Sequence, residues 1–387
     1  MTRSFHPPVR TLMGPGPSDV NPRILEALSR PTIGHLDPAF IGLMDDVKRL
    51  LQFAFRTRNA LTLPVSAPGS AGMECCFVNL VSPGDKVIVA QNGVFGGRMK
   101  ENVARCGASA VMVQDEWGSA VDPHKVEDAI RSNPEAKVLA FVHAETSTGA
   151  RSDAATLCGL ARQHGLLTIV DTVTGLGGID VDVDGWGADA VYSGTQKCLS
   201  CIPGLSPVTF SSRAQELIQK RTHKVQSWFL DMGLVMAYWG GSNQRAYHHT
   251  APINMLYGLH EALVILEEEG LANAWARHAH HHAALAAGLA ALGIDFVVDQ
   301  AHRLPQLNCV RIPAGVDDAQ VRRQLLDEYG LEIGAGLGPL AGKVWRIGLM
   351  GFAANRTNVL FCLGALEALL GRSGAVSAAR AFYASSP

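Results

Sequence analysis

Short apolar runs alternate with helical patterns through the first half of the chain, and this alternation constrains the fold more than any other feature. Strands are predicted for the four apolar runs 86–90, 110–113, 138–142 and 166–170. Helices are predicted for the three stretches between them, 98–106, 124–131 and 154–164. Such alternation indicates βαβ units, in which a mostly parallel sheet carries helices on both faces. In this α/β architecture ligands bind beyond the carboxyl ends of the strands, so we look for candidate residues at that edge.

A second region begins where a periodic apolar helix ends at Glu269-Gly270. A long Ala-rich helix is predicted from Leu271, and an α+β pattern follows it. This pattern has strands at 308–312 and 344–348 and helices near 319–326 and 360–370. At about 150 residues per domain, we expect three parts: an N-terminal arm (1–16), a large domain (17–270) and a small C-terminal domain (271–387).

Composition excludes several classes of protein. The 33 Lys and Arg residues nearly balance the 35 Asp and Glu residues, which argues against a nucleic-acid-binding surface or a polybasic membrane contact. No window approaches the roughly 18 apolar residues of a membrane span. No apolar stretch follows Arg3 as in a secretory signal, and eight cysteines are few enough to fit a reducing compartment. We therefore expect a cytoplasmic enzyme.

An acid and a lysine are predicted at the same edge of the sheet. The strand ending at Val170 runs directly into Asp171, and the next strand, 189–192, leads into Lys197. Pyridoxal phosphate chemistry needs this pair, since a lysine amine forms the Schiff base and an acid keeps the pyridinium nitrogen protonated. The same two residues would also fit a surface lysine and an Asp that caps a helix, so other motifs must decide.

A glycine- and serine-rich turn is a candidate phosphate cradle. The apolar run at 63–65 turns through Pro68-Gly69-Ser70 into a predicted helix, whose N-terminus would face an anion. Alternatively, Ser70 is simply the N-cap of that helix. No Walker Gly-Lys-Ser/Thr sequence occurs, which argues against an ATP-type loop. Phe95 follows a strand at the same edge, where it would either stack on a planar ring or pack on the sheet.

Arg346 lies inside an otherwise apolar strand. Burial of its charge requires an anion, which is either a structural carboxylate or the carboxylate of a substrate.

Two further clusters are weaker candidates. Cys198 and Cys201 form a C-x-x-C, but no second pair at zinc-finger spacing occurs, so packing is the better interpretation. His278, His280, His281 and His282 lie close together on the Ala-rich helix, where only the pairs 278/281 and 278/282 share a face. No acidic or cysteine partner is evident, so we expect a solvated face and no metal site.

Several motifs together resemble the alanine–glyoxylate / serine–pyruvate aminotransferases, class V members of the fold-type I pyridoxal phosphate enzymes. The resemblance covers about residues 10–370, and the ordered set is far more specific than any single motif. The motifs are Leu12-Met13-Gly14-Pro15-Gly16-Pro17, Thr195-Gln196-Lys197, Tyr247-His248-His249-Thr250, Gly336-Leu337-Gly338-Pro339 and Arg346-Ile347-Gly348. The resemblance implies a large domain with a mostly parallel sheet of seven-stranded type, a smaller α+β domain, and pyridoxal 5'-phosphate as cofactor.

The resemblance also implies a role for each matching residue. Lys197 would form the Schiff base and then move the α-proton, and Asp171 would pair with the pyridinium nitrogen. Tyr247 and Thr250 would reach the phosphate of the neighbouring subunit, which implies an obligate homodimer with shared sites. The other cofactor contacts would be Pro68, Gly69, Ser70 and Gln196 at the phosphate, Phe95 and Val173 at the ring, and Thr146 near the phenolic oxygen. Arg346 would bind the substrate carboxylate, and Gly14-Pro15-Gly16 would line the pocket.

Three residues depart from the pattern of this family. Phe95 stands where some members carry Trp, and Pro68 replaces a possible phosphate donor. His35 is bulkier than the serine found there in other members, and near the pocket entrance it would change the choice of amino donor. None of the three departures alters Lys197 or Asp171.

The predicted reaction moves the amino group of alanine or serine to glyoxylate or pyruvate. The nearest alternative is (S)-ureidoglycine–glyoxylate transamination, which Tyr247-His248-His249-Thr250 disfavours weakly. A class V lyase such as a cysteine desulfurase is less consistent with the chain, because that family carries His before the lysine and Gln196 stands here. A non-catalytic cofactor-binding protein is a third alternative, which the joint presence of Lys197, Asp171 and Arg346 opposes.

Overall fold

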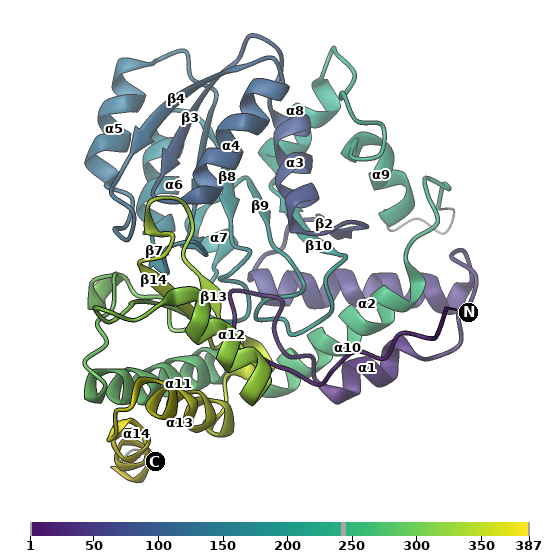
Figure 1. Ribbon diagram of the computed structural model, residues 1–387. Coiled ribbons are helices and arrows are strands. Elements are labelled where there is room, and N and C mark those ends of the chain that lie inside the picture. Colours follow the sequence, from purple (N-terminus) through teal and green to yellow (C-terminus); the bar gives the residue numbers. More distant parts are fainter. Residues whose placement is uncertain (1, 241–244, 386–387) are drawn as a thin grey trace.

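A seven-stranded sheet forms the centre of the computed structural model, which describes residues 2–240 and 245–385 (Figure 1). Its strands lie in the order β2-β10-β9-β8-β5-β3-β4. Strand β10 (Ser206–Phe210) runs antiparallel to β2 (Leu61–Val65) and β9 (Ala190–Tyr192), and the other pairs are parallel. The expected α/β architecture with a mostly parallel sheet is therefore confirmed.

The predicted strands of the sheet are present within one or two residues of their expected bounds. They are β3 (Lys86–Gln91), β4 (Ser109–Gln114), β5 (Val138–Val142) and β8 (Leu167–Asp171). All side chains of β5 and β8 are buried. Continuous apolar strands are buried in this way because helices cover a parallel sheet on both faces.

Four helices cover the two faces of the sheet. They are α3 (Gly69–Leu80), α4 (Val94–Arg105), α5 (Pro123–Ser132) and α6 (Ala154–Gln163). Helix α4 connects β3 to β4 and α5 connects β4 back to β5, in opposite directions across the sheet. Right-handed crossovers therefore place α4 and α5 on opposite faces. Local sequence defines the start of α5, where the Asp122 side chain accepts a hydrogen bond from His124 N (2.9 Å) and Pro123 occupies the first turn.

The C-terminal part of the chain forms a second layer, below the large sheet in Figure 1. Its antiparallel sheet contains β11 (Leu307–Arg311), β14 (Val344–Gly348) and β13 (Gly334–Ala335). Its helices are α11 (Leu271–Ala291), α12 (Asp318–Tyr329), α13 (Arg356–Leu370) and α14 (Ala375–Ser385). Their apolar side chains form a cluster separate from the cluster around the seven-stranded sheet. This separation supports two domains, while the boundary near residue 270 stays a prediction, since Gly270 alone separates α10 (Ile253–Glu269) from α11.

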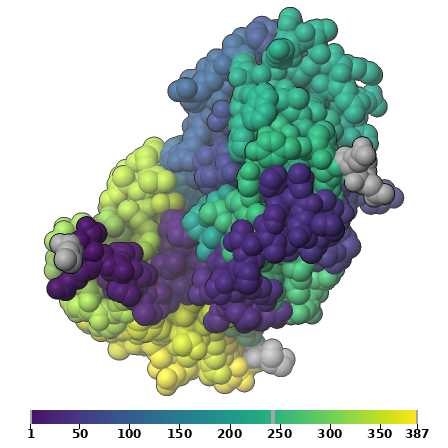
Figure 2. Space-filling model, turned by 90° about the vertical axis from the view of Figure 1, so that its right-hand side faces the viewer, coloured from purple at the N-terminus to yellow at the C-terminus, as the bar shows by residue number. Residues whose placement is uncertain are grey.

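The N-terminal segment lies against the C-terminal part. Strand β1 (Thr11–Leu12) pairs in parallel with β12 (Leu331–Glu332), and Met13 is buried in the C-terminal apolar cluster. Figure 2 shows this segment in dark purple on the surface beside yellow-green C-terminal residues. The start of the chain therefore crosses from one apolar cluster to the other.

Further helices, short strands and 3-10 turns complete the fold. They are the helices α1 (Pro22–Leu28), α2 (Pro38–Phe55), α7 (Val183–Trp186), α8 (Ser212–Lys220) and α9 (Met232–Trp239), the short strands β6 (Ala144–Glu145) and β7 (Ala150–Arg151), and the 3-10 turns η1 (Gln300–His302), η2 (Gly338–Leu340) and η3 (Gly351–Ala353). No helix among the described residues has the length and hydropathy needed to cross a bilayer.

The histidines of α11 differ from the expectation. His278 has no exposed surface, and its two ring nitrogens lie 2.6 Å from Ala274 O and 2.9 Å from Gly351 N. Burial lowers the pKa of His278 to about 4, so its ring is neutral. The predicted solvated face is therefore wrong at His278, because the turn that follows β14 covers it. Within residues 2–240 and 245–385, no group of three or more His, Cys, Asp or Glu side chains is placed to hold a metal ion.

Candidate active site

Lys197 lies beyond the carboxyl end of β9 with its side chain almost fully buried. Its Nζ donates a hydrogen bond to Pro15 O in the N-terminal segment. Burial, with a smaller contribution from the Arg346 guanidinium, lowers the pKa of Lys197 to about 8. About a tenth of this amine is therefore unprotonated at pH 7, far more than for an ordinary lysine, and a nucleophile or base requires the unprotonated form.

Asp171 is the last residue of β8 and is buried. Its carboxylate accepts hydrogen bonds from Tyr192 Oη (2.7 Å) and from Val173 N (2.8 Å). Burial raises the pKa of Asp171 to about 6, although these hydrogen bonds and Lys197 oppose the rise. Asp171 is thus neither exposed nor a helix cap. Tyr192, which fixes its carboxylate, was not predicted because its role depends on a contact between neighbouring strands.

Arg346 extends from β14 towards the same edge. Its Nε donates to Ala335 O (2.7 Å) and its Nη1 donates to Thr146 O (3.1 Å). The side chain is buried, yet no carboxylate of the described residues lies within ion-pair distance of it. The structural carboxylate considered as one alternative is therefore not found there. A buried guanidinium in this state favours the binding of an anion.

The segment Gly14-Pro15-Gly16 packs directly on Lys197. Gly16 has φ +98°, and a β-carbon at this position would lie 2.6 Å from Cδ of Lys197. A larger residue would therefore both strain the backbone and displace the lysine. Gly14 is buried, and a β-carbon there would lie 3.7 Å from Oε1 of Glu332. The backbone of this segment therefore lies directly against the lysine side chain at Gly16.

The N-terminus of α3 is open to an anion. Pro68 occupies the N-cap position without a side-chain hydrogen bond, so Ser70 is not the N-cap. The N–H groups of Gly69 and Ser70 have no acceptor among the described residues. The buried Oε1 of Gln196 also lacks a hydrogen-bond partner within that part of the chain. Free donors at a helix N-terminus fit a phosphate group.

Apolar and polar side chains lie next to this cradle. A β-carbon on Gly69 would lie 3.5 Å from Cγ2 of Val173, which places Val173 beside the cradle and next to Asp171. Thr146 is buried and hydrogen-bonded to Thr174 through the two hydroxyl groups. An acid for a ring nitrogen, an apolar support and an open phosphate site together fit pyridoxal phosphate.

Phe95 lies in the first turn of α4, which begins four residues before the predicted helix, so Phe95 is helical and not in a loop as expected. Its N–H donates to Oε2 of Glu145 (3.3 Å), and the Arg98 guanidinium lies 4.7 Å from its ring centroid. The position of Phe95 at the sheet edge agrees with the prediction, and its stacking on a cofactor ring stays a prediction.

Glu145 is a buried acid that sequence reasoning missed. Its carboxylate accepts hydrogen bonds from Ser147 Oγ (2.6 Å) and Ser147 N (3.0 Å), and it has no exposed surface. Burial raises the pKa of Glu145 to about 7, and Asp171 contributes in the same direction. One signal was present in the sequence, since Glu145 follows the apolar strand 138–142 by three residues, as Asp171 follows its own strand.

Tyr247 and Thr250 lie on the surface of this chain. Tyr247 is 63% exposed, its hydroxyl lies 3.5 Å from Oγ1 of Thr250, and its ring lies 5.2 Å from that of His35. Apart from each other, neither residue is hydrogen-bonded to a predicted cofactor residue within the described chain. Ser66, just before the phosphate cradle, is joined to the same segment through Nε2 of His249 (2.8 Å).

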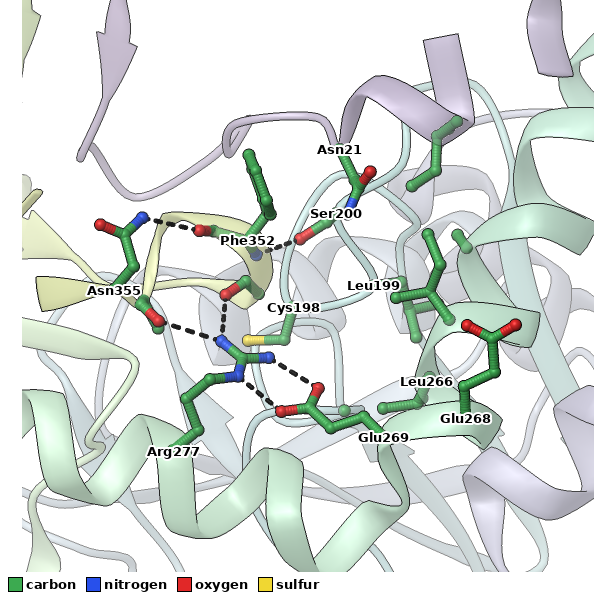
Figure 3. A pocket seen from close by; sticks show the side chains of 16 residues that line it. Asn21, Cys198, Leu199, Ser200, Leu266, Glu268, Glu269, Arg277, Phe352 and Asn355 are labelled. Carbon is green, nitrogen blue, oxygen red and sulfur yellow. Dashed lines mark hydrogen bonds and ion pairs between the residues drawn. The ribbon is translucent and has the colours of Figure 1, made fainter. Parts of the chain in front are cut away.

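Cys198 and Cys201 are buried and not disulfide-bonded. Burial raises the pKa of each thiol to about 12, which makes both chemically inert and favours a packing role. A pocket of about 480 Å³ lies behind this segment and is lined by Cys198, Leu199 and Ser200 together with α10, α11 and the turn after β14 (Figure 3).

Comparison with known proteins agrees with this geometry. The family model for class-V aminotransferases matches residues 36–348. The (S)-ureidoglycine–glyoxylate transaminase of Bacillus subtilis is 39% identical over 403 residues, covering 99% of this chain and 96% of that protein. The alanine–glyoxylate aminotransferase of Callithrix jacchus is 38% identical over 366 residues, covering 94% and 88%. The crystal structure of an alanine–glyoxylate aminotransferase from Nostoc sp. superimposes with a TM-score of 0.93 at 45% identity, covering 96% of this chain and 97% of that one.

The chain belongs to the class V aminotransferase family. It has the fold-type I architecture and is an enzyme that transfers amino groups with pyridoxal phosphate as its cofactor. The amino donor and acceptor are not fixed by membership of this family.

Proposed function

We propose that this enzyme transfers the amino group of a small α-amino acid, alanine or serine, to glyoxylate or pyruvate. The observation that carries the proposal is the buried Arg346 guanidinium, which has two backbone partners and no carboxylate partner among the described residues. A substrate α-carboxylate would satisfy it beside the Lys197 amine. The close packing of Gly16 on Lys197 supports small substrates.

Each residue of the site has a task in this reaction. Bound pyridoxal phosphate supplies a protonated ring that accepts the electron pair released when the α-proton leaves. Asp171, held by Tyr192, would keep the proton on the ring nitrogen, and Lys197 would hold and move the α-proton. Gly69, Ser70 and Gln196 would bind the phosphate, with Pro68 shaping their turn.

(S)-Ureidoglycine is a second candidate donor. A relative named for that reaction covers 99% of this chain at 39% identity, and the alanine–glyoxylate relative from Callithrix jacchus reaches a similar 38%. His35 lies against the Tyr247 ring at the surface, with 5.2 Å between the ring centroids.

A homodimer with shared sites and a cytoplasmic location complete the proposal. Exposure of Tyr247 and Thr250 supports the dimer, because these residues are free to reach a second copy. All eight cysteines are buried and free of disulfides, which supports a reducing compartment.

Visible absorbance of the purified enzyme with pyridoxal phosphate tests the function. L-Alanine is expected to bleach the yellow colour and glyoxylate to restore it, and the same assay with L-serine and (S)-ureidoglycine compares the donors. Bleaching by (S)-ureidoglycine alone would replace the proposed donor, and a colour that no amino donor changes would overturn the proposal. Lys197→Ala is the matched control, in which no amino donor should support turnover.

A further inference from the structure

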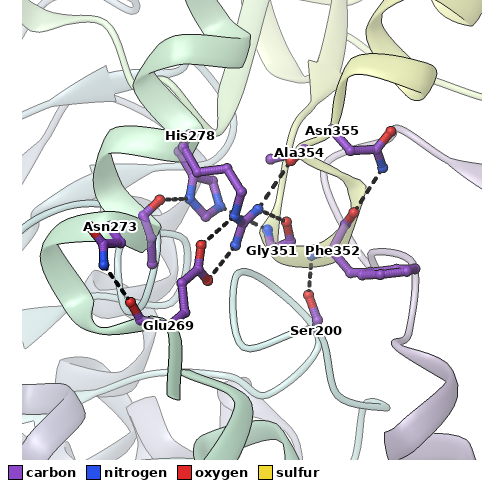
Figure 4. Close-up of polar contacts among 10 residues, drawn as sticks. Ser200, Glu269, Asn273, His278, Gly351, Phe352, Ala354 and Asn355 are labelled. Carbon is purple, nitrogen blue, oxygen red and sulfur yellow. Dashed lines mark hydrogen bonds and ion pairs between the residues drawn. The ribbon is translucent and has the colours of Figure 1, made fainter. Parts of the chain in front are cut away.

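A partly buried cluster of polar contacts surrounds the turn that follows β14 (Figure 4). Its centre is the turn formed by residues 351–354, here called the Gly351 turn, which follows β14. Its backbone groups are held by the side chains of Ser200, Arg277 and His278. These three side chains come from two parts of the chain that are far apart in sequence.

Ser200 connects the turn to the lysine segment. Its Oγ accepts a hydrogen bond from Phe352 N (2.6 Å), and its own N–H donates to Lys197 O (2.9 Å). Ser200 has φ +55°, and a β-carbon on Gly351 would lie 3.1 Å from its Cβ. A non-glycine residue keeps this strained conformation only where its surroundings hold it in place. The lysine segment and the turn therefore fit against each other without spare room.

Helix α11 holds the opposite side of the turn. Arg277 forms a bidentate ion pair with Glu269 (2.6 and 2.9 Å), and its Nη1 donates to Gly351 O (2.6 Å) and Ala354 O (3.1 Å). His278 accepts from Gly351 N at Nε2, so its Nδ1–H donates to Ala274 O. The ring is thereby fixed in one tautomer. Both residues act on the turn and neither contacts Lys197.

The position of this turn affects the geometry of the reaction. Gly351 lies five residues after Arg346 on a continuous strand and turn, so a displaced turn would displace the guanidinium. In an α-amino acid the nitrogen and the carboxylate are attached to the same carbon atom. The Lys197 amine and the Arg346 guanidinium must therefore stay at a fixed, short distance from each other. An error of about 1 Å in such a pair reduces rates severely.

We propose that Ser200, Arg277 and His278 are positioning residues that set the separation between the Lys197 amine and the Arg346 guanidinium. The proposal rests on the proposed function for the roles of Lys197 and Arg346. A merely structural cluster would instead affect stability and all substrates alike.

The first test uses the apoprotein and needs no activity. The pH dependence of chemical labelling at Lys197, measured by mass spectrometry, gives the pKa of its amine in the wild type, Ser200→Ala, His278→Leu and Arg346→Ala. Arg346 lowers the pKa of Lys197, so Ser200→Ala and His278→Leu should each raise this pKa if they displace the guanidinium. In a chain that already carries Arg346→Ala, neither substitution should raise the pKa of Lys197 further. His278→Gln, which keeps an acceptor for Gly351 N, should restore the wild-type value.

Asn273→Ala is the matched control on the same helix. Its side chain donates to Glu269 O (2.8 Å) but does not contact the Gly351 turn, so Lys197 should titrate as in the wild type. A Lys197 titration that is identical in wild type, Ser200→Ala and His278→Leu would overturn the positioning role.

The second test compares two amines with the loaded enzyme. Ser200→Ala should raise KM for L-alanine about tenfold with a smaller change in kcat, and it should leave the reaction of L-alaninamide, which lacks a carboxylate, unchanged. Equal losses for both amines, or losses that add to those of Arg346→Ala, would contradict the inference. If the wild type does not transaminate any donor, the proposed function fails, and the titration of Lys197 still decides the positioning role.

Discussion

At the scale of single residues, the site holds two buried carboxyl groups with different partners. Asp171 is fixed by Tyr192 and Val173, whereas Glu145 is fixed by Ser147 and by the backbone of Phe95. Burial raises the pKa of both, to about 6 for Asp171 and to about 7 for Glu145. Near neutral pH Asp171 is therefore largely ionised, while Glu145 carries its proton in about half of the molecules. The site therefore contains one carboxyl group that is mostly charged and another that is about half protonated. Perturbed pKa values of this kind are typical of functional sites.

Glu145 makes the stability of the apoprotein depend on pH. Its pKa is higher in the folded chain (about 7) than the ordinary 4.5, so the folded state binds the proton more tightly. The contribution of Glu145 is complete below pH 4.5 and is lost as pH rises towards 7, by about 3 kcal/mol. In Glu145→Gln, which keeps an acceptor for Ser147, this loss should be absent.

Chemical denaturation of wild type and Glu145→Gln at several pH values measures this difference. All other titrating groups are common to the two proteins, so the difference between their unfolding free energies isolates Glu145. A difference that stays constant from pH 4.5 to 7.5 would show that Glu145 is not protonated as argued.

At the scale of helices and strands, the sequence predicts elements that carry a strong pattern. Strand β14 has the predicted bounds, and the α10–α11 break lies at the predicted Gly270. Strand β10 was not predicted, because Ser206-Pro207-Val208-Thr209-Phe210 mixes polar and apolar residues and is buried through its pairing with β2 and β9. Periodicity describes one segment at a time, whereas such a strand is defined by its neighbours.

In the candidate site too, local sequence patterns predict some residues, whereas others depend on neighbours that are distant in sequence. Lys197, Asp171 and Arg346 were found from strand ends and from one charge within an apolar strand. Tyr192 was not found, because a hydroxyl within a strand acquires its role only when its neighbouring strand carries Asp171. His278 was assigned to a solvated face because helical spacing does not reveal which turn covers a helix.

The open N-terminus of α3 leads to a prediction at this scale. In Ser70→Asp, a negative charge enters the first turn of the helix, where it should stabilise the apoprotein by about 0.3–1 kcal/mol. The same charge would repel a phosphate group bound there, so affinity for pyridoxal phosphate should fall about tenfold or more. Affinity for pyridoxal, which lacks the phosphate, should change little.

Titration of the apoprotein with both compounds, followed by absorbance, measures the two affinities, and thermal denaturation measures stability. Ser70→Asn is the control, because it has nearly the shape of Asp without the charge. Equal weakening of pyridoxal and pyridoxal phosphate binding would place the phosphate elsewhere.

At the scale of the whole molecule, the single chain leaves the predicted phosphate-binding residues Tyr247 and Thr250 on its surface. Trp228, Phe229 and Tyr247 are large and exposed, and the rings of Trp228 and Phe229 contact the histidines of the 247–250 segment. Exposed apolar side chains grouped around a motif predicted to bind phosphate are consistent with a surface that a second copy covers. The position of Ser66, joined to His249, brings this surface close to the phosphate cradle of the same chain.

Mixing two inactive variants tests whether sites are shared between copies. One variant is Lys197→Ala, and the other carries Tyr247→Phe with Thr250→Val. If each site takes Lys197 from one chain and Tyr247 and Thr250 from the other, a hybrid dimer has one intact site. Because half of the dimers in an equal mixture are hybrids, co-expression or joint refolding should restore about a quarter of wild-type activity. Sites confined to single chains would give no more than the sum of the two separate variants, and light scattering on the same samples establishes whether the active species is a dimer.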